Sequence, residues 1–216
     1  MHIARNLSRI TQRIASACQS AGRDISEVTL IAVSKTFSII DIQAAYDAGH
    51  RHFGESRLQE AQPKIEALPK DIDWHFIGTL QSNKAKKIAQ KFPIIHTIDS
   101  ESKLKEIAKA ERLIQGFIEV NIANEPQKAG ISTDSLDVFR QTVLSYSQVH
   151  LTGLMTIGPT VSDPEQSRPY FRHLKDHASR LGLKQISMGM SQDFDVAIQE
   201  GATHIRVGSA IFGSRD

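Results

Sequence analysis

The sequence predicts an α/β fold, a (β/α)8 barrel of the TIM type preceded by one additional N-terminal helix. Short apolar runs alternate with longer amphipathic segments, and eight such alternations fit within 216 residues. The first segment is a helix that stands outside this alternation. An open, doubly wound sheet is the alternative that the same alternation leaves open. No linker rich in proline and glycine interrupts the chain, so a single domain over residues 1–216 is expected.

The opening segment, residues 1–23, is rich in arginine and lacks acidic residues, a composition that mitochondrial transit peptides share. Its apolar residues nevertheless recur at helical spacing along a single stripe, at Ile3, Leu7, Ile10, Ile14 and Ala17. This regular stripe favours a helix that belongs to the folded protein.

We expect strands in eight short apolar runs, at residues 28–35, 51–55, 73–78, 94–99, 116–122, 150–157, 184–190 and 204–212. We expect helices between them, at residues 39–48, 57–68, 83–91, 102–110, 135–145, 164–181 and 194–200. Alternate side chains of a strand point to opposite faces, so Ile205 and Val207 are expected to face the helices. Arg206 and Glu119 are then expected to point into the barrel.

Composition excludes several classes of function. The net charge of +2 comes from 26 basic and 24 acidic residues spread along the chain, so no nucleic-acid partner is expected. No apolar run approaches the roughly 20 residues of a membrane span, so no membrane association is expected. Cys18 is the only cysteine, which excludes an internal disulfide and cysteine-based zinc sites and indicates a reducing, cytoplasmic compartment.

Lys35 ends the apolar run LIAVSK, where the first strand is expected to give way to a loop. Barrels of this class carry their active sites at the C-terminal ends of the strands. Partial removal from water disfavours the ammonium form of a lysine there, and the free amine can form a Schiff base with an aldehyde. An exposed loop lysine is the alternative, because most lysines are solvated.

Two segments with glycine and serine, SMGMS at 187–191 and RVGSA at 206–210, occur in the last two expected strands. Barrels often build a phosphate site from the loops after strands seven and eight, although such segments are also common in ordinary turns. A Schiff-base lysine beside a phosphate site indicates a phosphorylated aldehyde or ketone, with pyridoxal 5′-phosphate (PLP) the natural candidate. Arg206 could bind the ring nitrogen of PLP or pair with Glu119.

Six motifs cover nearly the whole chain: AVSK at 32–35, FGES–LQE at 53–60, WHFIGTLQSNK at 74–84, GLMTI at 153–157, SMGMS–D at 187–193 and IRVGSAIFG at 205–213. In composition and order they resemble the motifs of the pyridoxal-phosphate homeostasis protein family. That family is similar in fold to the N-terminal barrel domain of the alanine racemases.

The resemblance implies that Lys35 holds PLP as an internal aldimine and that Arg206 faces the pyridine nitrogen. It also implies a set of residues around the phosphate: Ser187, Gly189, Ser191, Gly208 and Ser209. Three further residues match family positions near the pocket: His75, Asn83 and Met155. Ser56 departs from the family pattern, which usually has asparagine after FGE.

The function implied by the resemblance is PLP binding for intracellular PLP homeostasis, with apo forms of PLP-dependent enzymes as recipients. Little or no catalysis is expected, because the second base of the racemases is a tyrosine in a further domain and this sequence ends at Asp216. The tyrosines here fall in expected helices, at Tyr46, Tyr146 and Tyr170. An amino-acid racemase and a Schiff-base aldolase acting on a phosphorylated substrate are the alternatives. A monomer is expected.

Two further features of the sequence could form sites. His173 and His177 have the i, i+4 spacing of paired metal ligands, but no third ligand stands in register, so no metal site is expected. Lys128 lies in the loop after the fifth expected strand and matches a family position. It could contact phosphate or a departing cofactor, or it could be an exposed surface lysine.

Overall fold

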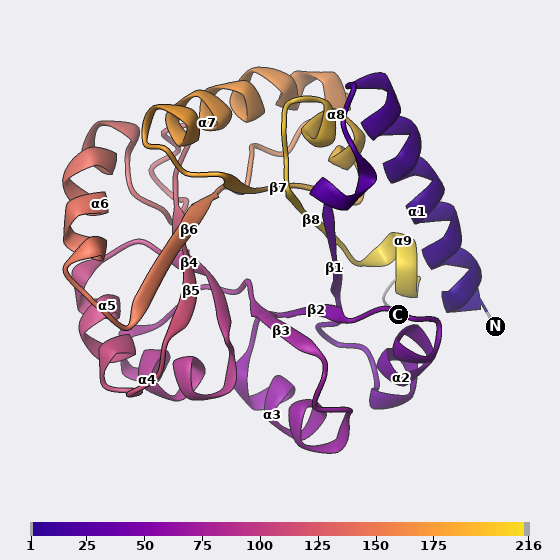
Figure 1. The fold of residues 1–216 in the computed structure, drawn as a ribbon, viewed down its shortest axis with the longest axis horizontal. Helices are drawn as coiled ribbons and strands as arrows, with labels where there is room; N and C mark the ends of the chain where they lie inside the picture. Colours follow the sequence, from indigo (N-terminus) through magenta and orange to yellow (C-terminus); the bar gives the residue numbers. More distant parts are fainter. Residues whose placement is uncertain (1, 214–216) are drawn as a thin grey trace.

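The computed structural model describes residues 2–213, in which eight parallel strands form a closed barrel in sequential order. The strands are β1 (Thr29–Val33), β2 (His52–Glu55), β3 (Asp73–Phe76), β4 (Ile94–Ile98), β5 (Ile114–Glu119), β6 (Val149–Met155), β7 (Gln185–Met190) and β8 (His204–Val207). Pairing of β1 with β8 closes the barrel and excludes the open sheet. Figure 1 looks along the barrel and shows the helices arranged in a ring around it.

The helices are α1 (His2–Ser20), α2 (Ile39–Asp47), α3 (Leu58–Ala67), α4 (Ser82–Lys91), α5 (Glu101–Ala108), α6 (Leu136–Leu144), α7 (Arg168–Arg180), α8 (Phe194–Gln199) and α9 (Ser209–Phe212). Short 3-10 turns lie at Ile25–Glu27, Thr133–Ser135 and Pro164–Ser167. Within residues 2–213, no helix has both the length and the apolar character needed to cross a membrane.

The prediction was wrong at the end of β8. Residues 209–212 were expected to continue the strand, but they form the short helix α9, because the carbonyl of Gly208 accepts hydrogen bonds from the N–H groups of Ile211 and Phe212 at 2.9 and 3.0 Å. Both side chains are buried, and a short apolar run cannot distinguish a buried strand from a buried helical turn. Tyr146 also lies just beyond α6 rather than inside it.

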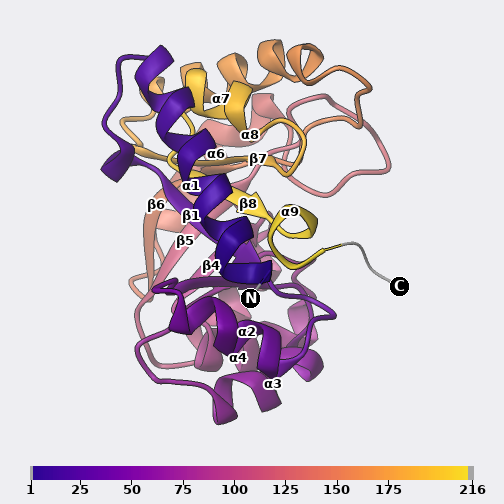
Figure 2. The same ribbon diagram turned by 90° about the vertical axis from the view of Figure 1, so that its right-hand side faces the viewer.

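Helix α1 is part of the folded barrel, as its apolar stripe predicted. All five stripe residues are buried, and Figure 2 shows the helix lying along the outside of the barrel beside α8 and α9. The amide of Asn6 donates to the carbonyl of Ile211 at 2.8 Å, which ties α1 to the end of the chain. The helix thus packs against α2, α8 and α9.

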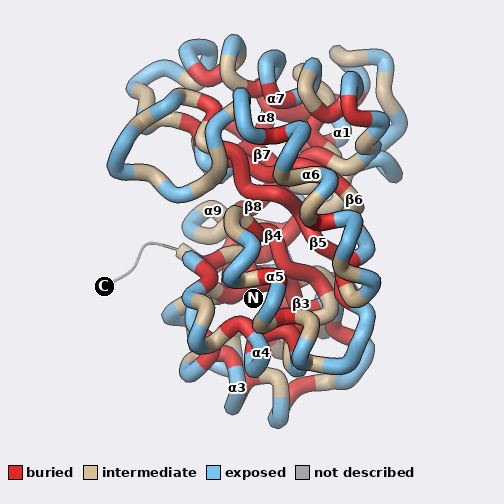
Figure 3. Tube along the Cα trace, turned by 90° about the vertical axis from the view of Figure 1, so that its left-hand side faces the viewer, coloured by how far each residue is buried: buried red, intermediate tan, exposed pale blue. Residues whose placement is uncertain are grey.

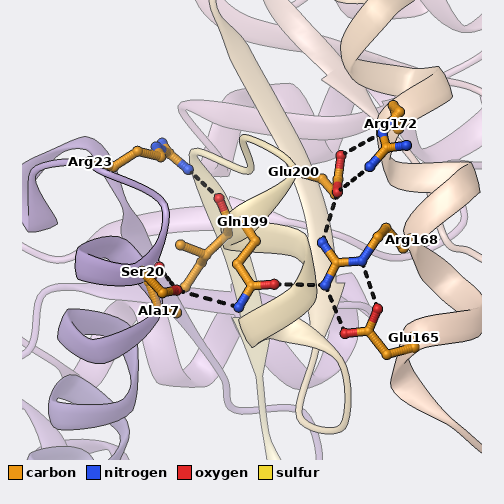
Figure 4. A network of polar contacts seen from close by, with 9 residues as sticks. Ala17, Ser20, Arg23, Glu165, Arg168, Arg172, Gln199 and Glu200 are labelled. Atoms are coloured by element: carbon orange, nitrogen blue, oxygen red, sulfur yellow. Dashed lines mark hydrogen bonds and ion pairs between the residues drawn. The ribbon is translucent and has the colours of Figure 1, made fainter.

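A polar network fixes α1, α7 and α8 to one another (Figure 4). The Gln199 amide donates to Ser20 in α1, and its carbonyl accepts from Arg168 in α7 at 2.7 Å. Arg168 and Arg172 both contact the largely buried carboxylate of Glu200. Exposed pairs stabilise little one by one, but several charges around a shielded carboxylate hold the three helices in register.

The protein has two chemically different cores. Between strands and helices lies a large apolar cluster that includes Ile205 and Val207, as strand alternation predicted, and Figure 3 shows the buried trace concentrated in the strands. Inside the barrel the only apolar cluster among the described residues is small, formed by Ile94, Phe117 and Met155. The rest of the interior is polar, so hydrogen-bonding side chains occupy part of the barrel centre.

Candidate functional site

A pocket of about 1030 Å³ opens at the C-terminal ends of the strands, the end at which the sequence predicted a site. It is walled by the ends of β1, β7 and β8 and by the loop that follows β6. Its polar lining includes Lys35, Ser191, Asp193, Arg206, Gly208 and Ser209. The structure therefore brings five of the predicted site residues into one cavity, and Asp193 joins them.

Lys35 projects from a strand end that is held firmly. Ser34, just before it, is fully buried, and its hydroxyl donates to Oε1 of Glu55 at 2.7 Å. The ammonium of Lys64 contacts the same oxygen at 2.8 Å and donates to the Ser34 carbonyl at 2.9 Å. After Lys35 the chain turns at once, since Thr36 has a φ of 70°, an uncommon conformation for a residue with a side chain. This arrangement presents the Lys35 side chain, itself half-buried, to the pocket.

The ends of β7 and β8 bring two hydroxyls and a backbone N–H together. The Gly208 N–H donates to Ser191 Oγ at 3.3 Å, and Ser209 Oγ lies 3.5 Å from the same oxygen. A Cβ on Gly208 would lie 3.4 Å from both the Cβ and the carbonyl oxygen of Val33, so the end of β8 passes close to β1 here. The three groups lie close enough together to donate to one anionic oxygen group, and the phosphate role that the sequence predicted for them stays a prediction.

Two of the predicted phosphate residues do not line this pocket. Gly189 has a φ of 87°, and a Cβ there would stand 2.5 Å from the Cβ of Ala197, so packing of β7 against α8 already requires glycine. Ser187 is fully buried below the pocket, where its hydroxyl accepts from Arg206. Sequence alone could not separate these roles, because a glycine needed for packing and one needed beside a phosphate look the same.

Arg206 forms part of the pocket floor and is only 6% exposed. One terminal nitrogen donates to Ser187 Oγ at 2.7 Å and the other to the Thr156 carbonyl at 2.8 Å. Burial lowers the pKa of Arg206 to about 10, opposed by the charges of Glu119 and Asp193, so the guanidinium stays protonated at neutral pH. Its hydrogen bonds thus go to a serine and a carbonyl, and Glu119 acts on it through charge.

Glu119 points into the barrel, as predicted, and is 5% exposed. Burial raises the pKa of this carboxyl to about 7, and the nearby charge of Asp99 acts in the same direction. Lys103 and Arg206 oppose that increase. Glu119 does not line the pocket, so its charge affects the pocket floor from below.

The three remaining family positions lie off the pocket wall. His75 is fully buried inside the barrel, Met155 packs with Ile94 and Phe117, and Asn83 lies in the first turn of α4.

Lys128 does not line the pocket either. Its ammonium lies 2.6 Å from Oε1 of Glu125 and donates to the Gly158 carbonyl at 3.0 Å. Gly158 is flanked by Ile157 and Pro159, which do line the pocket. Lys128 therefore ties the loop after β5 to the loop that forms one pocket wall.

His173 and His177 form an exposed pair on α7, with their Nε2 atoms 3.0 Å apart. The described part of the chain contains no group of three or more His, Cys, Asp or Glu side chains arranged to hold a metal ion.

A set of histidines inside the barrel was not recognised from the sequence. His52, His75, His96 and His204 lie in four strands, and their rings contact one another across the interior. Burial, the dominant cause, lowers the pKa of His75 and His96 well below the usual value. Strand alternation could have placed each ring inside, but only the register between strands brings the rings into contact.

Two largely buried histidines, His50 and His204, make stability depend on pH. Burial lowers the pKa of His50 and of His204 to about 4, whereas a histidine in an unfolded chain has a pKa of about 6.5. Between these values the unfolded chain binds more protons, so their contribution is complete above about pH 6.5 and is lost as the pH falls. We expect the unfolding free energy to drop by about 1.4 kcal/mol per pH unit for each such histidine.

Urea unfolding at a series of pH values between neutral and mildly acidic conditions measures this slope. His204→Phe should reduce the slope by about one bound proton. An unfolding free energy that stays constant, or rises, as the solution is acidified through this range would contradict the assignment of neutral buried histidines.

The fold and the pocket define a class of protein, the barrel of the alanine racemase N-terminal domain, whose family model matches residues 5–216. Alanine racemase from Bartonella henselae with covalently bound pyridoxal phosphate aligns with a TM-score of 0.75, over 99% of this chain and 58% of that one. At 16% identity, this likeness shows the fold alone.

Within that class, the chain belongs to the pyridoxal phosphate homeostasis protein family. It is 40% identical to the "Pyridoxal phosphate homeostasis protein" of Aquifex aeolicus, over 100% of this chain and 99% of the relative. The structure of PipY from Synechococcus elongatus with PLP bound aligns with a TM-score of 0.80 at 36% identity, over 94% of this chain and 100% of that one. The family resemblance inferred from the six motifs is confirmed.

Proposed function

We propose that this chain binds PLP covalently through Lys35 and takes part in intracellular PLP homeostasis and delivery. The observation that carries the proposal is the meeting of Lys35, Arg206 and the Ser191–Gly208–Ser209 cluster in one pocket at the strand ends. The PLP-bound structure of a relative that is 36% identical supports it. The donors fit the cofactor, since an amine, a guanidinium and two hydroxyls match its aldehyde, ring nitrogen and phosphate.

Each group has a distinct role in this proposal. The ε-amine of Lys35 would form a C=N bond with the aldehyde carbon, with loss of one water. Ser191 and Ser209 would donate to phosphate oxygens, together with the N–H of Gly208. Arg206 would donate to the ring nitrogen, which it can do only while that nitrogen is unprotonated. PLP would supply electrophilic and electron-withdrawing chemistry when bound.

Ser187 and Gly189 would act on the cofactor indirectly. Ser187 is fully buried and accepts from Arg206, so its part would be to hold the guanidinium. Gly189 would shape the turn at the end of β7 that carries Ser191. His75, Asn83 and Met155 would support the pocket from positions behind its wall.

We expect Ser191→Ala to weaken PLP retention by about 1–3 kcal/mol, because a donor to a charged phosphate is lost. Ser209→Ala should have a similar effect. Equilibrium binding of PLP, with Ser100→Ala at the N-cap of α5 as the control for a hydroxyl away from the pocket, measures it. Binding by both pocket variants that equals binding by the control would place the phosphate elsewhere.

We propose that catalysis is weak or absent. A racemase needs a second proton carrier on the opposite face of the cofactor. The described tyrosines do not line the pocket: Tyr46 and Tyr146 bond to surface carboxylates, and Tyr170 lies in α7. A guanidinium at the ring nitrogen also leaves the ring a weaker electron sink, because it does not readily give up a proton. These features suit a carrier better than an amino-acid racemase.

The PLP-loaded protein incubated with L-alanine in deuterated water tests this proposal. We expect α-proton exchange and racemisation no faster than with free PLP, within about tenfold, because neither a second base nor a protonated ring is provided. In a parallel sample, an added apo form of a PLP-dependent enzyme should gain activity as the carrier loses cofactor.

Fast racemisation that disappears in Lys35→Ala would make this protein an enzyme. A borohydride-trapped sugar phosphate in place of PLP would favour the aldolase alternative. Either result would overturn the carrier proposal.

We further propose that the chain acts as a single-domain monomer in the cytoplasm. Closure of all eight strands into one barrel supports the single domain, and the free, buried thiol of Cys18 fits a reducing compartment.

A further inference from the structure

A continuous line of hydrogen-bonding groups runs through the barrel interior to the pocket floor. Nδ1 of His52 lies 3.2 Å from Nε2 of His75, and Nδ1 of His75 lies 2.9 Å from Nε2 of His96. Nδ1 of His96 then lies 2.9 Å from the hydroxyl of Ser187, which accepts from Arg206 at 2.7 Å. This hydrogen-bond chain crosses five strands, and both ring-to-ring links join Nδ1 of one histidine to Nε2 of the next.

Counting the protons shows which group donates at each link of this hydrogen-bond chain. A guanidinium has no acceptor, so Arg206 must donate to Ser187. Among the residues that the structure describes, the Ser187 hydroxyl has one other partner, His96, so its own proton is directed to Nδ1 of that ring. His96 must then carry its proton on Nε2 and donate to His75.

The same rule continues to the end of the chain. His75, accepting at Nδ1, carries its proton on Nε2 and donates to Nδ1 of His52. If the chain ran the other way, Ser187 would accept from both Arg206 and His96, and its own proton would lack an acceptor in a fully buried site. An unsatisfied buried polar group is costly, so the order that starts at Arg206 is favoured.

Neutral rings are required for this order, and the surroundings supply them. His75 and His96 are fully buried, which disfavours a proton on either ring, and the charge of Arg206 acts in the same direction on His96. His96 is also held in orientation by parallel stacking on Phe117, with ring centroids 4.2 Å apart. The ring therefore presents Nδ1 to Ser187 in a fixed position.

We propose that His52, His75, His96 and Ser187 are positioning residues that hold Arg206 as a fixed donor at the pocket floor. One N–H of each terminal nitrogen donates to Ser187 or to Thr156, and these two hydrogen bonds fix the plane of the Arg206 guanidinium. Its remaining N–H groups can then donate to a ligand in the pocket. Specificity would follow, because the pocket accepts a ring with an unprotonated acceptor nitrogen. The statement about specificity rests on the proposed function, because it takes the ligand to be PLP-like. The order of the hydrogen bonds does not depend on it.

The far end of the hydrogen-bond chain, at His52, lies at the end of the barrel opposite the pocket. His52 begins β2, its side chain is 38% exposed, and its Nδ1 lies 3.6 Å from a carboxylate oxygen of Asp73. A proton placed on this nitrogen would compete directly with the hydrogen bond from His75. His52 thus ends the chain where solvent can reach it.

The direction of the chain can be read without any ligand. Nitrogen-15 NMR of ligand-free protein labelled in histidine distinguishes the two neutral tautomers. We expect His75 and His96 to carry the proton on Nε2. A proton on Nδ1 of His96 would overturn the inference, whether or not the protein binds PLP.

The effect of the hydrogen-bond chain on the pocket is tested with 4′-deoxypyridoxine 5′-phosphate. This ligand lacks the aldehyde, so its binding does not require a covalent bond to Lys35. We expect His96→Phe, which keeps the ring stack but removes the acceptor for Ser187, to weaken binding about tenfold. A carbocyclic counterpart with CH in place of the ring nitrogen should lose less than about twofold. His96→Asn, which can place an oxygen near the Nδ1 position, should restore most of the affinity for the pyridine ligand.

His204→Phe is the matched control, because His204 lies among the same interior rings but bonds to Thr203 rather than to this chain. Equal losses in His96→Phe and His204→Phe, or equal losses for the pyridine and carbocyclic ligands, would show a general packing effect and overturn the inference. Failure of the wild-type protein to bind either ligand would refute the proposed function instead and leave the tautomer result standing.

Discussion

Lys35→Ala should abolish covalent retention of PLP while leaving the barrel folded. The side chain projects into the pocket from the end of β1, where its amine contributes reactivity and little packing. Protein mixed with PLP and passed through a desalting column should keep a visible absorption band in the wild type and lose it in the variant. Unchanged circular dichroism would show that the fold survives.

Lys128→Ala is the matched control, because Lys128 lies near the same loops but does not line the pocket. It should keep the band. Retention of the full band by Lys35→Ala, together with its loss in Lys128→Ala, would transfer the covalent role to the loop after β5.

Lys64→Met should strongly destabilise the fold. Lys64 and Glu55 form a pair 2.8 Å apart, with side chains 9% and 0% exposed, and Glu55 also accepts from Ser34. Removal of the ammonium leaves a buried carboxylate without its counter-charge, which costs about 3–5 kcal/mol. Urea unfolding, followed by circular dichroism, measures the loss.

The double variant Glu55→Gln/Lys64→Met should recover part of that loss, because the uncompensated charge is removed as well. Lys105→Met breaks an exposed pair with Glu101, whose side chains are 61% and 53% exposed, and should change stability by less than about 1 kcal/mol. Equal, small effects of Lys64→Met and Lys105→Met would show that the buried pair does not hold the end of β1.

Most of the fold could be predicted from the sequence because the barrel repeats one simple unit. Each strand is a short apolar run and each helix an amphipathic one, so periodicity located all eight strands and the helices between them. The exception was α9, where four apolar and small residues carry no period long enough to separate a strand from a helical turn. There the Gly208 carbonyl, which receives two N–H groups, decides the conformation.

The sequence predicted which strand ends form the candidate site, but not which residues line the pocket and which lie behind its wall. Motifs at the strand ends located Lys35, Ser191, Arg206, Gly208 and Ser209, because chain position alone brings strand ends together in a barrel. Motifs could not separate residues on the pocket wall from those behind it, since both kinds lie in the same short segments.

The sequence does not reveal the hydrogen-bond chain of the interior histidines. It depends on how β2, β3, β4 and β7 are staggered, and the pairing of β7 with β8 is itself irregular between Ser187 and Met190. A single-residue shift in any of these registers would turn a ring away from its partner.

The central claim is that Lys35 holds PLP, and chemical trapping tests it most directly. The wild-type protein is incubated with PLP, reduced with borohydride, digested and mapped by tandem mass spectrometry. We expect the reduced pyridoxyl group on the peptide that contains Lys35, at a stoichiometry approaching one per chain. Modification spread over surface lysines, or concentrated on Lys64 or Lys128 with Lys35 unmodified, would contradict the claim.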